Sequence, residues 1–192
     1  LDAGALTRLL SQLREAQQAG AISTYVLTLA TADETWGAYL GSPAPMVHVR
    51  AARFLTQRTT ISGTLAAAVP GFDGPARPIV RGWALVVTAR DPARVSAAAA
   101  LVKWLISADN LGAWTRSANL APARRSAFDR WPPADRYTEF LRQQLERGIA
   151  PPPAQVAQVV GPALQKAVAD VLRGQAQPSD AAIYASTSLS RK

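Results

Sequence analysis

The sequence has no cysteine and a single histidine, and it contains none of the common catalytic motifs. Without cysteine the chain can form neither a disulfide nor a thiolate metal site. Its one histidine, His48, stands in the short apolar run "MVHVR" (46–50), where a hydrogen-bonded structural histidine is more common than a catalytic base. No GxSxG, P-loop, GxGxxG or HExxH motif is present. We therefore expect a protein that is not an enzyme and that uses no metal or cofactor.

Long apolar runs are also missing, and acidic residues are few. No run approaches the roughly 20 apolar residues that a bilayer-spanning helix needs. The 21 lysines and arginines outnumber the 13 acidic residues, which gives a net charge of +8 and favours anionic partners. However, the arginines are scattered along the chain, whereas nucleic-acid-binding domains usually concentrate them on one face or in a tail. No nucleic-acid partner is expected, but a basic nucleic-acid-binding domain and a non-catalytic interaction domain remain alternatives.

Helical signals are frequent, above all in the second half of the chain. Apolar residues recur at helical spacing in residues 3–19, and Gly20 follows where a glycine would end that helix. Asp91 and Pro92 are typical of an N-cap and a first helical position. The remaining predicted helices cover residues 31–39, a short stretch containing Leu111 and Trp114, 134–147, 154–173, and a last segment capped by Ser179.

Four strand-like runs mix with these helices in the first half. They are "TYVLTLA" (24–30), "MVHVR" (46–50), "TLAAAVP" (64–70) and "IVRGWALVV" (79–87). The last of these is interrupted by Arg81, Gly82 and Trp83. An indole ring offers a face on which a sugar can stack, arginine offers a fork of donors, and glycine allows close approach of a ligand. The alternative is that Trp83 is core packing and Gly82 a bulge.

Several longer segments occur in an order that resembles one family. These segments are "TWGAYLGSPAPMVHVRAARF" (35–54), "AAAVPGFDGP" (66–75), "VRGWALVVTARDPARVSAAAALVKWLIS" (80–107), "AWTRSANLAPARRSAF" (113–128) and "LQKAVADVLRGQAQPSDAA" (164–182). Together they cover nearly the whole chain. Their order and spacing resemble the C-terminal portion of the extracellular solute-binding proteins of ABC importers, in the family that includes maltodextrin-binding and other sugar-binding proteins.

This resemblance implies a fold and a division of the chain. The fold would be α/β, the C-terminal lobe of a type II periplasmic-binding-protein-like architecture, with a mixed sheet flanked by helices and a helix-rich C-terminal half. Residues 1–78 and 121–192 would belong to this second lobe. Residues 79–120 would form a cross-over segment that packs on a first lobe, which has no counterpart in these 192 residues. Trp104 and Trp114 would be core residues of their helices.

The resemblance also implies a function. The chain would be part of the substrate-binding component of an ABC transporter, which captures a solute, in particular a carbohydrate, in an interlobe cleft and delivers it to the membrane permease. The ligand-binding residues would be Trp83, Arg81, Gly82, Arg50, Arg53 and Trp36. The protein would be extracellular or periplasmic, with a lipid anchor on a preceding segment as one option. An apolar patch exposed by the missing lobe would favour a homodimer of this chain.

Overall fold

The structure is a computed structural model that describes residues 1–41, 46–61, 63–133 and 135–190. The chain divides into two compact units. Unit 1 comprises Leu1–Pro43 and Pro152–Lys192, and unit 2 comprises Ala44–Pro151. Helices dominate both units, and the described residues form one small antiparallel sheet, made of β1 (Pro70–Gly71) and β2 (Gly74–Pro75).

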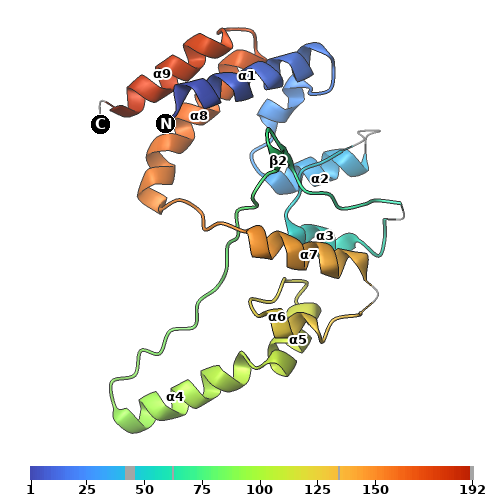
Figure 1. Cartoon of the computed structure of the whole chain (residues 1–192), viewed down its shortest axis with the longest axis vertical. Helices are drawn as coiled ribbons and strands as arrows, with labels where there is room; N and C mark the ends of the chain where they lie inside the picture. Colours follow the sequence, from blue (N-terminus) through green and yellow to red (C-terminus); the bar gives the residue numbers. More distant parts are fainter. Residues whose placement is uncertain (42–45, 62, 134, 191–192) are drawn as a thin grey trace. The chain divides into compact units, whose positions relative to one another are not determined.

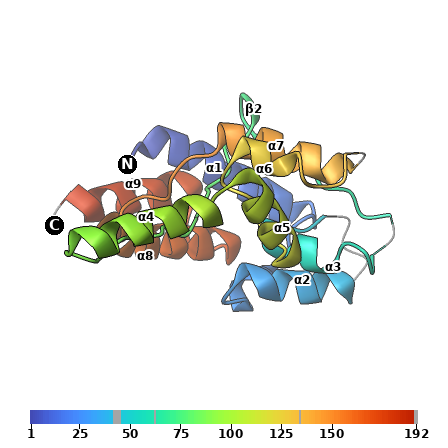
Figure 2. The same cartoon turned by 90° about the horizontal axis from the view of Figure 1, so that it is seen from below.

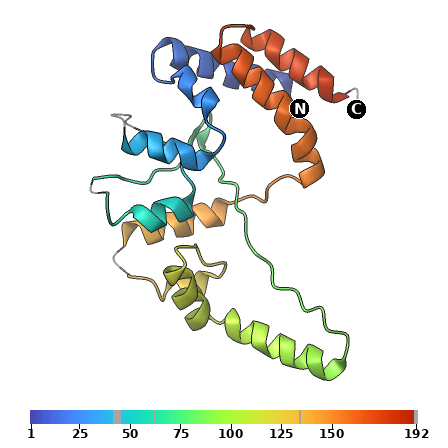
Figure 3. The same cartoon turned by 180° about the vertical axis from the view of Figure 1, so that it is seen from behind.

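Three helices form the centre of unit 1. They are α1 (Ala3–Gln18), α8 (Ala154–Leu172) and α9 (Pro178–Ser190), which lie side by side in Figures 1 and 3. Alanines on α9 allow the helices to approach closely, while the larger aliphatic side chains of α1 and α8 fill the space between them. The buried core consists of Leu6, Leu10, Ala167, Val171, Ala181, Ala182 and Ala185.

Unit 1 also contains the 3-10 helix η1 (Thr24–Thr28) and helix α2 (Ala32–Leu40). The Glu34 carboxylate stabilises the N-terminus of α2. It accepts a hydrogen bond from the backbone amide of Ala30 at 2.9 Å and one from the Thr31 hydroxyl at 3.1 Å. Trp36 on α2 is 1% exposed, and its ring centroid lies 5.5 Å from that of Tyr39. The indole is therefore a packing residue in this structure.

The core of unit 2 is built around helix α7 (Arg136–Arg147), which follows α3 (Ala51–Gln57), α4 (Pro92–Leu105), α5 (Ala108–Ser117) and α6 (Arg125–Phe128). Helices α5 and α6 lie against each other (Figure 2). Four side chains form the buried cluster, namely Leu55, Phe128, Trp131 and Leu141. Because these residues come from α3, the α6–α7 region and α7, the cluster joins segments that are far apart in the sequence.

A polar contact reinforces the packing of α3 against α7. Arg58 pairs with Asp135, the N-cap of α7, and the Phe54 ring centroid lies 4.6 Å from that of Tyr137. Burial raises the pKa of Tyr137 to about 12. Burial alone would also raise the pKa of Asp135, but hydrogen bonds from Arg58, Thr138 and the Tyr137 amide outweigh it and hold that pKa below its usual value.

The predicted α/β fold class, a periplasmic-binding-protein-like lobe with a mixed sheet, is wrong for this structure. Residues 24–28 form a 3-10 helix instead of a strand, and residues 46–50, 64–69 and 80–90 have no regular secondary structure. These runs do not form strands because they lack a neighbouring strand to pair with. A strand is stabilised by backbone hydrogen bonds to a neighbour, and strand-like composition alone does not provide one.

Most of the helix signals, by contrast, are confirmed, although Ser179, the predicted cap of the last helix, lies inside α9. Gly20 and Gly174 follow α1 and α8 with φ angles of 74° and 72°, which a glycine adopts without strain. The Asp91 carboxylate accepts a hydrogen bond from the Arg94 amide at 3.0 Å at the start of α4, and Gly148 ends α7. Local capping chemistry therefore predicted where these helices begin and end.

Candidate functional site

The predicted ligand-binding segment begins where Ile79 forms a parallel bridge with Ile149. There the Val80 amide donates to the Ile149 carbonyl at 2.9 Å, and the Ile149 amide donates to the Pro78 carbonyl at 2.9 Å. Beyond Val80 the chain runs as an extended trace to the start of α4, as Figure 3 shows. Within the described residues, the backbone of residues 81–90 makes no backbone–backbone hydrogen bond.

Arg81, Gly82 and Trp83 line a shallow hollow on this extended segment, with a volume of about 280 Å³. The Trp83 side chain is 92% exposed, so its ring is available to stack on a ligand. A methyl group added at Gly82 would meet no atom within 4 Å, so the glycine is not needed for packing within this chain. The alternative that Trp83 is core packing does not describe this structure.

The other predicted ligand-binding residues lie elsewhere. Arg50 is the N-cap of α3 and Arg53 lies in its first turn, and both belong to unit 2. Among the described residues, neither lines the hollow at Trp83. Trp36 belongs to unit 1 and is buried, so its ring presents no face to a solute in this structure. Of the predicted ligand-binding residues, only the consecutive residues 81–83 therefore lie together in the structure.

The tryptophans expected in the core are exposed. Trp104 on α4 is 61% exposed and Trp114 on α5 is 57% exposed, so that expectation is wrong for this structure. Helix α4 has no buried residue in the structure, although its sequence is rich in alanine, valine and leucine. Helical spacing of apolar residues indicates which face of a helix is covered, but it does not provide the covering surface.

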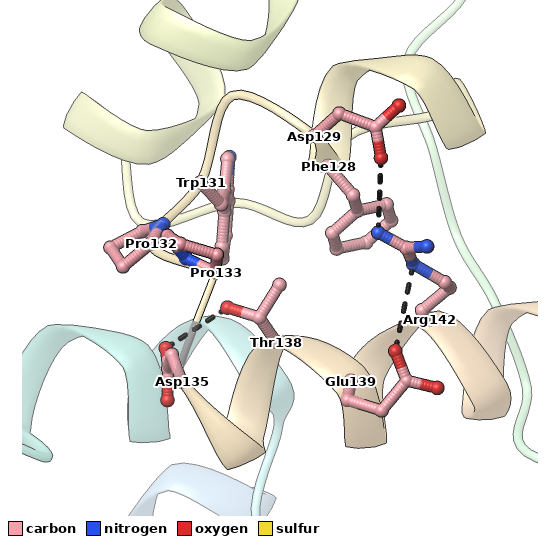
Figure 4. Close-up of a pocket in the computed structure, with 9 residues that line it drawn as sticks. All are labelled: Phe128, Asp129, Trp131, Pro132, Pro133, Asp135, Thr138, Glu139 and Arg142. Atoms are coloured by element: carbon pink, nitrogen blue, oxygen red, sulfur yellow. Dashed lines mark hydrogen bonds and ion pairs between the residues drawn. The ribbon is translucent and has the colours of Figure 1, made fainter.

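A second hollow, of about 390 Å³, lies beside the first turns of α7. Phe128, Trp131, Pro132, Asp129, Glu139 and Arg142 are among its lining residues (Figure 4). The sequence pattern did not predict this site, since acidic residues such as Glu139 are common on solvated helix faces. One signal was present, because Glu139 and Arg142 stand three residues apart on one helix face, shortly after an aromatic and proline-rich turn.

Metal and membrane sites find no support in the described residues. The part of the chain that the structure describes contains no group of three or more histidine, cysteine, aspartate or glutamate side chains that could hold a metal ion. Nor does any helix within the described ranges have both the length and the apolar character that crossing a membrane requires.

Comparisons with protein-family models, with curated proteins and with solved structures found no match to this chain. The resemblance to solute-binding proteins therefore depends on the segments quoted above and on their order.

Proposed function

We propose that this chain is part of the substrate-binding component of an ABC importer, which captures an extracellular solute, with carbohydrate as the substrate class, and delivers it to a membrane permease. The observation that carries this proposal is the extended segment 81–90, which presents Trp83 with 92% of its surface exposed and flanks it with Gly82 and Arg81. The neighbouring Leu85 and Val86 are also exposed, and an exposed apolar patch of this kind is typical of a surface that a ligand or another polypeptide covers.

The composition of the extended segment supports a covered position in the functional protein. Leu85 and Val86 are 57% and 76% exposed, and they project from a backbone without neighbouring strands. Neighbouring exposed apolar side chains are typical of a surface that a ligand or another polypeptide covers. A first lobe that packs on residues 81–90 would satisfy their backbone groups and cover these side chains.

Helix α4 supports the same conclusion. Leu101, Trp104 and Leu105 are 56%, 61% and 39% exposed, and apolar residues occur all around the helix. A helix of this kind is normally buried in a larger core. The extended segment and α4 are consecutive, so one partner surface could cover both. This fits the proposed role of residues 79–120 as a cross-over segment on a first lobe.

The polar groups nearby suit a sugar. The exposed Trp83 ring can stack on the CH face of a pyranose, and the Arg81 guanidinium can donate hydrogen bonds to its hydroxyl groups. Arg50 and Arg53 are proposed as further donors at the edge of the cleft in the complete receptor. Closure of two lobes around the solute would exclude water and strengthen each of these hydrogen bonds.

Tryptophan fluorescence and the melting temperature of the chain, measured against neutral sugars, acidic sugars and sugar phosphates, test this proposal. We expect a saturable change with one sugar class that is lost in Trp83→Ala and retained in Trp104→Ala, a matched control because both rings are exposed. If no solute changes either signal, this chain does not bind one, and the non-catalytic interaction domain becomes the better interpretation.

A second candidate function is binding of single-stranded nucleic acid. Three exposed tryptophans, Trp83, Trp104 and Trp114, occur in unit 2 together with exposed cations that include Arg81 and Lys103. Bases stack on such rings, while cations contact the phosphates. Titration with an oligonucleotide at two salt concentrations separates this candidate from the first, since nucleic-acid binding weakens steeply as salt rises.

A further inference from the structure

The hollow of about 390 Å³ beside α7 is open to solvent and is lined by one compact set of residues in unit 2. Its volume falls in the range of small-molecule sites, roughly 300–1,000 Å³. In Figure 4, Phe128 and Arg142 lie toward one end of the hollow and Trp131 and Pro133 toward the other, and the Phe128 and Trp131 rings contact each other. We name this feature the α7 pocket.

The aromatic wall of the α7 pocket is held rigidly. Phe128 and Trp131 are 3% and 4% exposed, and their ring centroids lie 5.5 Å apart. The Trp131 indole Nε1 donates to the Gly112 carbonyl at 3.2 Å, which fixes the orientation of the ring. A side chain at position 112 would meet the Ala127 carbonyl at 2.7 Å, so glycine is needed there for this close approach. The wall is therefore formed before any ligand arrives.

The polar wall is an alternating array of acceptors and donors. Arg142 Nη2 donates to Asp129 Oδ1 at 3.2 Å, and Arg142 Nε lies 3.8 Å from Glu139 Oε2 (Figure 4). Nε is buried and makes no hydrogen bond within the described residues, so a ligand would meet Arg142 through the terminal Nη atoms of its guanidinium. The Asp129 and Glu139 side chains are 65% and 59% exposed, which leaves their remaining acceptor positions accessible.

The charges disfavour anionic ligands, and arginine pairing partly neutralises the carboxylates that would attract a cation. Asp129, Asp135 and Glu139 repel phosphate and carboxylate groups. Arg142 stands between two of these carboxylates, and Arg58 pairs with the third, so a cation would meet arginine charge as well. A neutral hydroxyl group can both donate to a carboxylate and accept from a guanidinium. Adjacent hydroxyls on one carbon chain therefore match the acceptor–donor–acceptor array.

The geometry points to a binding site for a neutral polyhydroxy compound of monosaccharide size in the α7 pocket. Its hydroxyl groups bond to Asp129, Glu139 and Arg142, while its carbon skeleton lies against Pro132 and Pro133, which are less buried than Trp131. Among the described residues, none of those proposed to bind solute on the extended segment lines this pocket. The inference therefore does not depend on the proposed function.

Heteronuclear NMR of the complete chain, titrated with glucose and with myo-inositol, tests this site. We expect saturable shifts confined to the Trp131 indole and the backbone amides of residues 128–131 and 135–142. Asp129→Ala and Glu139→Ala should each weaken binding about tenfold, since each removes a charged acceptor of a ligand hydroxyl. The matched control is Glu146→Ala, also on α7 and paired with Arg125 outside the pocket, which should leave binding unchanged.

Three outcomes would overturn the inference. One is the absence of saturable shifts at the pocket with either compound in a correctly folded protein. Another is binding that survives both Asp129→Ala and Glu139→Ala. The third is preferential binding of glucose 6-phosphate or choline, which would show an ionic site. Trp83→Ala separates this site from the proposed function, because it should leave the α7 pocket shifts intact even if it abolishes a response elsewhere.

Discussion

Ile79 and Ile149 face each other in a parallel bridge that joins the start of the extended segment to the end of α7. Arg147 strengthens this junction, since its Nη2 donates to the Pro75 carbonyl at 2.6 Å, and its own carbonyl accepts from Arg77 Nε at 3.1 Å. This bridge is the one place where the predicted strand at 79–87 has a described backbone partner. It fixes where the exposed residues that follow leave the body of unit 2.

Gly148→Ala should disrupt this junction. A methyl group at position 148 would clash with Val80 Cγ2, so the two segments would have to separate. We expect a loss of about 1–3 kcal/mol in the free energy of unfolding, as for other overpacked sites. Denaturant unfolding measures it. Gly82→Ala is the control, because it meets no atom within 4 Å. Equal stability of the two variants would show that the close approach of Gly148 to Val80 contributes little to stability.

Leu10→Ala should strongly destabilise the helices of unit 1. Leu10 is 0% exposed within the α1–α8–α9 core, and its removal leaves a cavity. The expected cost is about 2–5 kcal/mol in the free energy of unfolding. Leu9→Ala serves as the matched control, since Leu9 neighbours it on α1 and is 44% exposed. Similar losses in both variants, measured by thermal unfolding, would show that α1 does not pack through this face.

Trp131→Phe should destabilise unit 2 by about 1–3 kcal/mol. The phenyl ring keeps most of the apolar volume but removes the indole Nε1, which leaves the Gly112 carbonyl without that donor. Trp114→Phe removes the same group from a side chain that is 57% exposed and should change stability little. Denaturant midpoints of the two variants distinguish a structural hydrogen bond from a general effect of losing an indole.

The Asp135 carboxylate should make the stability of unit 2 depend on pH in acid. Its folded pKa lies below the value of 3.8 expected for the unfolded chain, because the hydrogen bonds it accepts outweigh its burial. The folded state therefore binds protons less readily than the unfolded state. The stabilisation is fully present above the unfolded pKa and is lost as the pH falls through the folded pKa.

Asp135→Asn tests this contribution through the pH dependence of the denaturant midpoint. The variant keeps a side chain that can cap α7 but removes the titrating charge and its pairing with Arg58. Its midpoint should fall less steeply in acid than that of the unchanged protein. Parallel curves for the two proteins would assign the acid sensitivity to other carboxylates.

Trp83→Ala should leave the stability of the chain within about 0.5 kcal/mol, since the ring is 92% exposed. In a complete receptor, the same change should weaken solute binding by about 1–3 kcal/mol, because a stacking partner is lost. Melting temperature and a binding titration read the two effects separately. Lowered stability with unchanged affinity would instead make Trp83 a packing residue.

Much of the helical structure could be predicted from local chemistry. The aspartate and proline at 91–92 indicated the start of α4, and Gly20 and Gly174 indicated the ends of α1 and α8. These signals act within one helical turn, so they do not depend on the rest of the fold. The strand-like runs at 46–50 and 64–69 did not become strands, because a strand depends on a partner that can be distant in sequence.

The site residues divide in the same way. The sequence alone marked Arg81, Gly82 and Trp83 as an interruption of an apolar run, and the structure leaves all three exposed. The sequence could not indicate that Trp36 is buried or that Trp104 is exposed, since the exposure of each ring depends on which other segments pack against it. The α7 pocket could not be predicted for the same reason, because its aromatic wall and its polar array become one surface only when the α6–α7 region folds.

The sequence by itself therefore determined the boundaries of the capped helices such as α1, α4 and α8, the basic charge, the lack of cysteine chemistry and the unusual residues 81–83. The tertiary structure alone decided which of the apolar runs are paired, which tryptophans are covered and how Phe128, Trp131 and Arg142 meet around one hollow. The physical reason is the distance along the chain over which each interaction acts. Capping and helical spacing act over a few residues, whereas strand pairing, burial and pocket formation require contacts between segments that are far apart in the chain.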